Sequence, residues 1–273
     1  MIGNLRKMRT AVNEQGAVSY QLQLNDETVP LAPYIGQSVS LRFSGAIRCI
    51  GCSRPTKKSF SQGYCFSCFK KLAACDSCIM SPEKCHYHLG TCREPEWAEQ
   101  YCMQSHYVYL ANSSGLKVGI TRGDQLPTRW LDQGATQARA MFIVPNRRLS
   151  GLVETIFKDV VADKTNWRTM LKGPSELIDL EAEQERLIGQ VWQQLDGLQY
   201  EFGIQAITEV EYGQTHQFDY PVLSYPTKVV SLNAEKQPEI SGTLLGIKGQ
   251  YWILDTGVIN LRKYTGYEVE FTA

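Results

Sequence analysis

Hydrophobic and polar residues alternate along two stretches near the start of the chain. Every second residue is apolar over residues 18–24 and again over 39–43. Successive side chains of a strand point to opposite faces, so this period of two predicts two strands of a half-buried sheet. Two prolines and Gly36 break the pattern between them. We therefore expect a small antiparallel unit that ends near Ile47.

The C-terminal part of the chain, from Gly203 onward, shows the same strand-like pattern. Residues 242–257 predict two strands around a turn at Lys248–Gly249, and residues 267–271 alternate apolar and polar side chains. A sheet of three or four strands is only marginally stable by itself. Both ends of the chain are therefore expected to pair in one small antiparallel β-barrel or sandwich, with an OB-like barrel as a candidate form.

Aromatic and basic residues near the C-terminus allow two interpretations. On an outer face they would suit a single-stranded nucleic acid, because bases stack on aromatic rings and phosphates pair with cations. Alternatively, the rings fill the barrel core while the basic side chains face solvent. The residues concerned are Tyr251, Trp252, Arg262, Lys263 and Tyr264.

The middle of the chain mixes the periods of strands and helices, which predicts an α+β fold class. Apolar residues recur every second position in its first part and at helical spacing in its second part. The predicted order is a strand over 106–111, a turn at 112–115, a strand over 116–121, a short helix over 128–133, a strand over 137–144, and helices over 147–161 and 177–195.

A first zinc site is predicted from the spacing of cysteines. All nine cysteines of the chain lie between Cys49 and Cys102. The pair Cys49-x2-Cys52 is followed, after twelve intervening residues, by Cys65-x2-Cys68. Two such pairs supply the four thiolates that a tetrahedral zinc ion needs, each about 2.3 Å from the metal. A site with four protein ligands is closed and structural.

A second structural zinc site is predicted farther along, and its ligands have alternatives. His86 or His88 competes with the cysteines for one position. Cys102 is left over, either as a buried thiol or, with His106 four residues later, as a further ligand. Redox or iron–sulfur use of the thiols is another alternative. The preferred ligands are Cys75, Cys78, Cys85 and Cys92.

Composition and charge narrow the class of protein. The chain is 43% hydrophobic and 21% charged, as in ordinary globular proteins, and it has neither a membrane-spanning apolar run nor a secretory signal peptide. We expect a cytoplasmic protein, whose thiols stay reduced. Lys+Arg and Asp+Glu balance at 28 each, yet residues 28–75 contain no acidic residue. This basic block favours a polyanion partner, or it offsets the charge of metal-bound thiolates.

Short motifs after the cysteines resemble a known superfamily. Tyr109 lies on the first strand, Lys117 and Gly119 lie on the second, and Arg129 follows ten residues later. The helix after the third strand carries Glu154. Over residues 105–172 this arrangement resembles a GIY-YIG nuclease domain. Together with the upstream cysteines, the chain is also similar to an uncharacterised bacterial zinc-ribbon family with no assigned function.

The resemblance implies a role for each matching residue. Tyr109 would line the cleft near the scissile phosphate, and Gly119 would let the backbone approach closely. Arg129 would bind phosphate oxygens and stabilise charge in the transition state. Glu154 would hold Mg²⁺ or Mn²⁺ together with substrate phosphate and water. From the residues alone, a tyrosine on a strand such as Tyr109 is more often a core or edge aromatic than a catalytic residue, and Arg129 fits an ion pair with Asp132.

Lys117 departs from the superfamily pattern, which has a tyrosine that acts as a general base. Lysine is protonated at neutral pH unless it is strongly desolvated, so it favours phosphate binding over proton abstraction. The predicted function is a zinc-containing protein that binds nucleic acid (DNA or RNA), with metal-dependent phosphodiester cleavage as a candidate activity. The alternative is a non-catalytic zinc-ribbon adaptor that binds structured RNA or protein.

These patterns divide the chain into four predicted segments. Residues 1–48 supply strands that pair with those of residues 201–273 in the barrel. Residues 49–104 form the zinc-binding block with two sites. Residues 105–200 form the GIY-YIG-like domain with its C-terminal helix.

Overall fold

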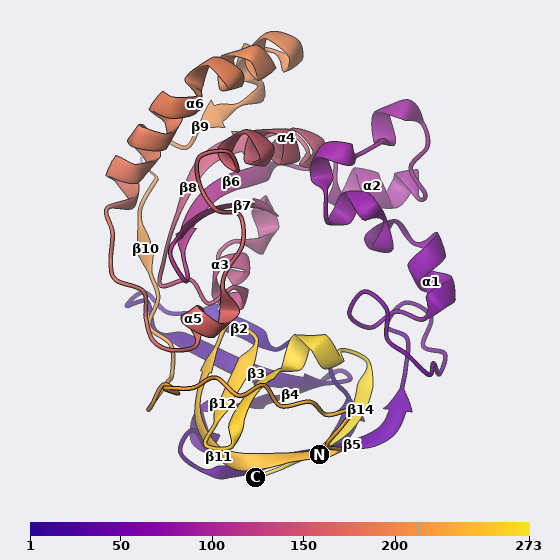
Figure 1. Ribbon diagram of the computed structural model, residues 1–273. Helices are drawn as coiled ribbons and strands as arrows, with labels where there is room; N and C mark the ends of the chain where they lie inside the picture. The colour runs from indigo at the N-terminus through magenta and orange to yellow at the C-terminus, as the bar shows by residue number, and fades with distance from the viewer. Residues whose placement is uncertain (212) are drawn as a thin grey trace.

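The computed structural model describes residues 1–211 and 213–273 and shows an α+β fold with several antiparallel sheets (Figure 1). This confirms the predicted fold class. The largest sheet combines both ends of the chain, and both termini lie beside it. Its strands, in spatial order, are β1 (Ile2–Asn4), β14 (Tyr267–Thr272), β5 (Ser38–Ile47), β11 (Glu239–Lys248), β12 (Tyr251–Leu254) and β13 (Gly257–Asn260).

Within the described residues, none of the sheets closes into a barrel, so the expected barrel was wrong. The six-stranded sheet ends at β1 on one side and at β13 on the other. The first alternating stretch does not join it, because β3 (Val18–Leu24) pairs instead with β2 (Arg9–Val12) and β4 (Glu27–Pro30). The apolar face of β3 packs into the same hydrophobic core as the larger sheet. Its apolar side chains are therefore buried between two sheets, and no barrel needs to close.

The aromatic residues near the C-terminus mostly fill this core. Trp252 and Tyr264 are 1% and 2% exposed. Tyr251 is half-buried and stacks on Trp167 at 5.6 Å between ring centroids. The interpretation of these rings as a core is therefore the better one for Trp252 and Tyr264.

A third sheet has five strands and carries helices on one face. Its strands are β10 (His216–Gln217), β8 (Gln137–Val144), β6 (His106–Asn112) and β7 (Leu116–Arg122), with β9 (Thr208–Glu209) pairing to β8. Alternate residues of β6 separate two cores, since Val108 packs with α4 (Arg147–Phe157) and α6 (Leu180–Phe202), whereas Tyr109 packs toward the terminal sheets. The predicted order of hairpin, helix, strand and helix is present.

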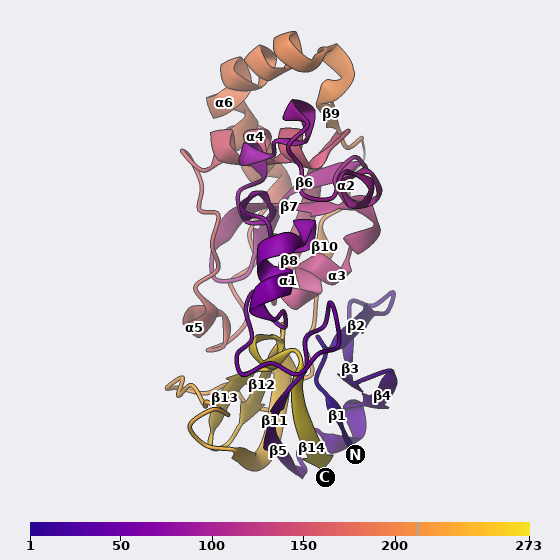
Figure 2. The ribbon, with the colours of Figure 1, turned by 90° about the vertical axis from the view of Figure 1, so that its right-hand side faces the viewer.

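The cysteine-rich block runs from β5 to the start of the five-stranded sheet (Figures 1 and 2). It contains α1 (Phe66–Lys71) and α2 (Pro95–Tyr101), joined by short 3₁₀ turns. The other short helices are α3 (Thr128–Asp132) and α5 (Trp167–Met170). The 3₁₀ turns of the chain are η1 (Ala32–Tyr34), η2 (Ala73–Cys75), η3 (Ser77–Ile79), η4 (Pro82–Lys84), η5 (Tyr87–Leu89), η6 (Gly123–Gln125), η7 (Ile204–Ala206) and η8 (Leu261–Tyr264).

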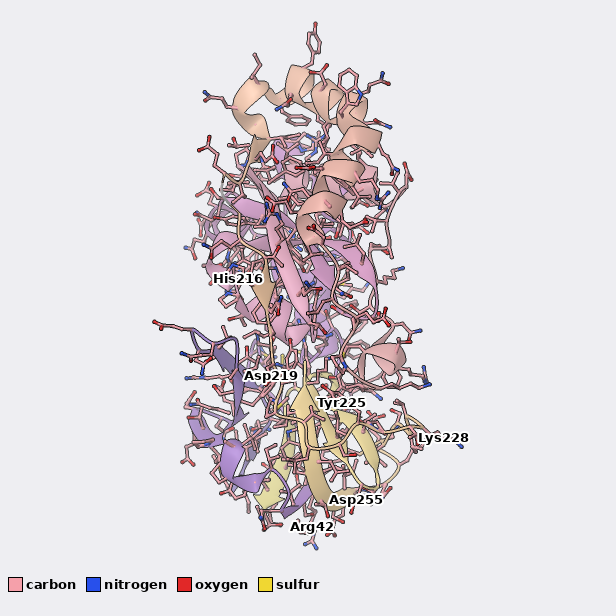
Figure 3. The ribbon with its side chains drawn as sticks, turned by 90° about the vertical axis from the view of Figure 1, so that its left-hand side faces the viewer. Arg42, His216, Asp219, Tyr225, Lys228 and Asp255 are labelled. Carbon is pink, nitrogen blue, oxygen red and sulfur yellow. The ribbon has the colours of Figure 1, made fainter. Side chains whose placement is uncertain are left out.

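A long connection returns the chain from the five-stranded sheet to the six-stranded one. Figure 3 shows His216 beside the upper sheet and follows the chain past Asp219, Tyr225 and Lys228 along the lower sheets. The backbone of Asp219 bonds to that of Gly16 and Val18, each at 2.8 Å, which ties the connection to the three-stranded sheet. No helix among the described residues is long and apolar enough to cross a membrane.

Candidate metal centres and an arginine-lined cavity

The first predicted group of cysteines is assembled in the structure. The ligand atoms of Cys49, Cys52, Cys65 and Cys68 all lie within 4.8 Å of one another. The sulfurs of Cys52 and Cys65 are 3.8 Å apart. This spacing suits four thiolates around one tetrahedral zinc ion. The group can therefore bind zinc in the manner of a zinc ribbon.

Local backbone geometry explains why these four sulfurs meet. The N–H groups of Gly51 and Cys65 point at the sulfur of Cys49, at 3.4 and 3.2 Å. Burial opposes ionisation of Cys49, but several backbone N–H groups outweigh it and lower its pKa to about 6. Burial and the neighbouring sulfurs raise the pKa of Cys68 to about 12. Four like charges cannot coexist here without a cation, so the site suits a metal.

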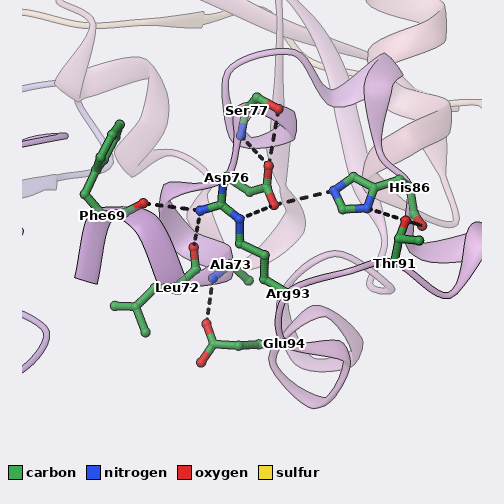
Figure 4. Close-up of polar contacts among 9 residues, drawn as sticks. All are labelled: Phe69, Leu72, Ala73, Asp76, Ser77, His86, Thr91, Arg93 and Glu94. Carbon is green, nitrogen blue, oxygen red and sulfur yellow. Dashed lines mark hydrogen bonds and ion pairs between the residues drawn. The ribbon is translucent and has the colours of Figure 1, made fainter. Parts of the chain in front are cut away.

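A second group that can hold a metal consists of Asp76, Cys78 and His86, whose ligand atoms also lie within 4.8 Å. Its carboxylate already has partners (Figure 4). The Oδ2 atom of Asp76 lies 2.7 Å from Nε of Arg93 and 3.4 Å from Nε2 of His86. Oδ1 accepts a bond of 2.6 Å from the backbone of Ser77. Although burial raises it, the Ser77 N–H group and the Arg93 charge lower the pKa of Asp76. A cation here would have to compete with Arg93.

The four sulfurs preferred for the second site are not all brought together. Cys75, Cys78, Cys85 and Cys92 do not form a group within 4.8 Å in the part of the chain that the structure describes. Cys75 lies instead toward the first group, because its N–H donates to the carbonyl of Leu72 at 3.1 Å and the N–H of Leu72 donates to the carbonyl of Cys68 at 2.9 Å. Of the competing histidines, His86 contacts Asp76, whereas His88 is exposed.

The four residues of the predicted catalytic cleft lie close to one another. The hydroxyl of Tyr109 and the Nζ atom of Lys117 both donate to Oε1 of Gln133, at 3.1 and 2.5 Å. The charges of Arg129 and Glu154 act on both Tyr109 and Lys117. Tyr109 is 0% exposed and Lys117 is 4% exposed, and neither lines the cavity that holds Arg129 and Glu154. Lys117 borders a neighbouring cavity together with Gln133 and Asp163.

Gly119 is required by this packing. A Cβ atom at Gly119 would lie 2.7 Å from the hydroxyl oxygen of Tyr109 and 2.7 Å from the ring carbon that bears it. The two residues face each other across paired strands β6 and β7. A glycine is therefore needed at position 119 because the Tyr109 ring packs directly against its backbone.

Burial changes the chemistry expected of Lys117. Desolvation, followed by the charge of Arg129, lowers the pKa of Lys117 to about 7. A sizeable neutral fraction then exists at neutral pH, in contrast to the ordinary lysine expected from the sequence. Burial also raises the pKa of Glu154, whose carboxylate lies 3.2 Å from Nζ of Lys158.

Arg129 and Glu154 line an open cavity of about 400 Å³ with several other charged residues. Lys7 and Arg122 in its wall have carboxylate partners, at 2.6 Å from Asp132 and 2.5 Å from Asp124. Asp132 therefore pairs with Lys7 rather than with Arg129. The charged residues of the wall are Lys7, Arg122, Arg129, Asp132, Arg147, Glu154 and Arg262.

Three arginines of the cavity lack an ion-pair partner. Among the described residues, no carboxylate lies within 4.0 Å of Arg129, Arg147 or Arg262. Arg147 donates to the carbonyl of Ile79, and Arg262 donates to Gln62, each at 2.7 Å. Burial lowers the pKa of Arg262, and the charge of Arg129 lowers it further. Burial also lowers the pKa of Arg147, although the nearby thiols of Cys102 and Cys78 act in the opposite direction. The wall of the cavity thus holds five cationic side chains and two carboxylates, those of Asp132 and Glu154.

Sequence reasoning missed most of this wall. The spacing of the motifs identified Arg129 and Glu154. Lys7, Arg122 and Arg147 come from separate segments with no shared motif, and Arg262 was expected on the face of a barrel. A larger cavity, of about 810 Å³, is lined by Trp130 and His216 and has few charges. It contains none of the predicted site residues.

Comparison with known proteins gives one match. A family described as "Protein of unknown function (DUF2797)" matches residues 36–269. The matched stretch includes all nine cysteines and the three unpaired arginines. No curated protein and no solved structure matches the chain. The resemblance to GIY-YIG nucleases therefore stays a prediction.

Proposed function

Because the chain belongs to the DUF2797 family, whose description names no activity, we propose a function from the site itself. The protein binds the phosphodiester backbone of a nucleic acid in the cavity lined by Arg129, Arg147 and Arg262. The GIY-YIG resemblance of residues 105–172 supports the same conclusion, because it assigns phosphate binding to Arg129.

The observation that carries this proposal is the convergence of three arginines without carboxylate partners. A guanidinium group can donate two parallel bonds to phosphate oxygens, and its charge persists even when it is partly buried. Like charges held close together cost free energy unless an anion joins them. A phosphodiester chain supplies such anions at regular spacing.

The cysteine block contributes to the same cavity. Ile79, Met80 and Pro82 form part of its wall, opposite the residues of the five-stranded sheet. These three residues lie between Cys78 and Cys85, so metal binding nearby would hold this wall in place. The zinc-binding block would thus act as a rigid support for the cavity.

A second candidate function is metal-dependent hydrolysis of the bound phosphodiester. Glu154 shares the cavity wall with Arg129, and one carboxylate with substrate phosphate and water suits Mg²⁺ or Mn²⁺. Such an ion would supply Lewis-acid activation of a phosphoryl oxygen. Arg129 would bind that phosphate. Lys117 and Tyr109, which both donate to Gln133, would act on it only through their charge and dipole.

Binding and cleavage can be separated in one experiment. Fluorescence anisotropy with labelled DNA and RNA oligonucleotides should show at least about a tenfold loss of affinity in Arg129→Gln, since a charge-assisted bond is worth about 1.5–3 kcal/mol. Arg42→Gln is the matched control, because Arg42 is exposed, pairs with Glu239 and lies at the far end of the molecule (Figure 3). Equal affinity in all three proteins would contradict the proposal.

Cleavage is then measured with Mg²⁺ or Mn²⁺ in wild type and in Glu154→Ala. Products in wild type that disappear in Glu154→Ala while binding persists would support hydrolysis. Binding without products in either protein would favour a non-catalytic role. No binding of any nucleic acid would favour the adaptor that recognises another protein.

A further inference from the structure

The carboxylate of Asp76 joins two loops that each carry a cysteine (Figure 4). Arg93, which contacts it at 2.7 Å, directly follows Cys92. His86, which contacts it at 3.4 Å, directly follows Cys85. Asp76 itself lies two residues before a third cysteine. A single buried side chain therefore fixes the neighbours of three cysteines in one place.

The loop between Cys85 and Cys92 is closed at its base. Nδ1 of His86 lies 2.8 Å from Oγ1 of Thr91, and the same hydroxyl donates to the carbonyl of His86 at 3.3 Å. These two residues directly follow Cys85 and directly precede Cys92. Their bonds bring the two cysteines toward each other.

Arg147 links Cys102 to Cys78. Its backbone N–H donates to the carbonyl of Cys102 at 2.8 Å, and its Nη2 donates to the carbonyl of Ile79 at 2.7 Å. Ile79 directly follows Cys78. The Nε atom of Arg147 is buried and has no hydrogen-bond partner among the described residues. A buried donor without an acceptor costs free energy, and a nearby thiolate could accept its hydrogen bond.

Cys85 lies against the same helix as Arg147. Its N–H group bonds to the carbonyl of Pro82 at 3.0 Å, which closes the turn η4. That turn packs tightly on α4, since a Cβ atom at Gly151 would lie 2.5 Å from the backbone nitrogen of Glu83. Gly151 comes one helical turn after Arg147.

We propose that Cys78, Cys85, Cys92 and Cys102 form a second zinc site, with Arg147 beside it. Four thiolates around Zn²⁺ carry two net negative charges, and the buried Arg147 guanidinium would offset one of them. Cys102 replaces Cys75 of the set expected from spacing, because Cys75 bonds to Leu72, which in turn bonds to Cys68 of the first site. The four sulfurs are not all within 4.8 Å of one another, so metal binding would draw the loop 85–92 inward.

Metal content of purified full-length protein tests this set. Wild type should hold about two zinc ions per chain, and Cys102→Ser should hold about one, because a site that loses one of four ligands binds zinc much more weakly. Cys75→Ser is the matched control and should keep both ions. Asp76→Asn should also keep both, because Asp76 positions the loops and is not a ligand, and loss of an ion in this variant would favour the group of Asp76, Cys78 and His86 instead. Loss of an ion in Cys75→Ser, or two ions in Cys102→Ser, would overturn the proposal.

A second variant covers the case in which Cys102→Ser does not fold. Cys102→His supplies a nitrogen ligand and should retain two metal ions. In the protein loaded with Co²⁺, this exchange should shift the ligand-field bands of one of two sites toward shorter wavelength, because nitrogen is a stronger-field ligand than thiolate. Cys75→His should leave the cobalt spectrum unchanged. A spectrum unaffected by Cys102→His, or altered by Cys75→His, would show that the assignment is wrong.

Discussion

The first cysteine group and the arginine-lined cavity are built in opposite ways. The ligands Cys49, Cys52, Cys65 and Cys68 come from one short segment and are aligned by their own backbone N–H groups. The cavity takes its cations from four segments far apart in sequence, from Lys7 to Arg262. The metal group depends on local turns, whereas the cavity exists only when all the sheets are in place.

This difference explains what a change at each place would do. Loss of a cysteine ligand removes a cross-link and should unfold its block. Loss of an arginine removes charge from the cavity wall, but other contacts keep the shape of that wall. Asp132 makes two such contacts. It bonds to Lys7 and to Gln250, which joins the N-terminal segment, α3 and the C-terminal sheet. Stability and binding should therefore respond separately.

The largest effect is expected from Cys65→Ser. This variant should lose about one zinc ion per chain, and its free energy of unfolding should fall by several kcal/mol, because structural zinc contributes about 10 kcal/mol or more in zinc-finger peptides. Zinc analysis and calorimetric unfolding measure both quantities. Cys75→Ser should keep its zinc and change stability much less. Full zinc content in Cys65→Ser would show that the first group is not a metal site.

The first group could be predicted from the sequence because CxxC pairs place their ligands within single turns. The group of Asp76, Cys78 and His86 could not, since the pair Cys75-x2-Cys78 has the same spacing although only Cys78 joins a group of ligand atoms within 4.8 Å. Asp76 contacts both Arg93 and His86 in the folded chain, and the spacing of residues along the sequence does not predict these contacts.

The sheets show the same division between local and distant information. Period-two patterns correctly predicted β3 and β5 as strands. They carry no information on partners, so β3 was expected in a barrel and instead pairs with β2 and β4. The cavity was not predictable for the same reason. No local pattern marks Arg147 or Arg262, and they come close to Arg129 only in the folded chain.

Lys117 should give the next largest effect, and it depends on pH. Its pKa is about 7 in the folded protein and close to 10.5 when unfolded. Between these values the unfolded chain binds the extra proton, so the free energy of unfolding rises with pH across this window. Below pH 7 both states are protonated and the cost of burying the charge is fully present.

Lys117→Met removes this titration. The variant should be more stable than wild type near pH 6, by a few kcal/mol, and the difference should shrink toward pH 10, at up to about 1.4 kcal/mol per unit of pH. Chemical unfolding at both pH values measures it. The exposed Lys263→Met serves as the control and should shift stability equally at both. A constant difference for Lys117→Met would mean that Lys117 stays charged in the fold.

A smaller effect is expected where the two cores meet. Gly119→Ala places a Cβ atom 2.7 Å from the fully buried Tyr109 ring and should cost about 1–3 kcal/mol through overpacking. Gly189→Ala is the matched control, because Gly189 is exposed within α6 and an added Cβ meets nothing within 4 Å. That change should stabilise the protein by up to about 1 kcal/mol. Urea unfolding should thus move the two variants in opposite directions.

The smallest and most specific effect concerns the salt dependence of nucleic-acid binding. Each arginine that contacts a phosphate contributes about one unit to the slope of log affinity against log salt concentration. Arg129→Gln should lower that slope by about one, and Arg129→Gln combined with Arg262→Gln by about two, with unfolding free energies close to wild type. Arg42→Gln should leave the slope unchanged, since Arg42 pairs with Glu239 outside the cavity. If the slopes stay the same while affinity falls, the arginines act by shaping the cavity, and the contrast between a locally built metal group and a distributed charged surface would no longer hold.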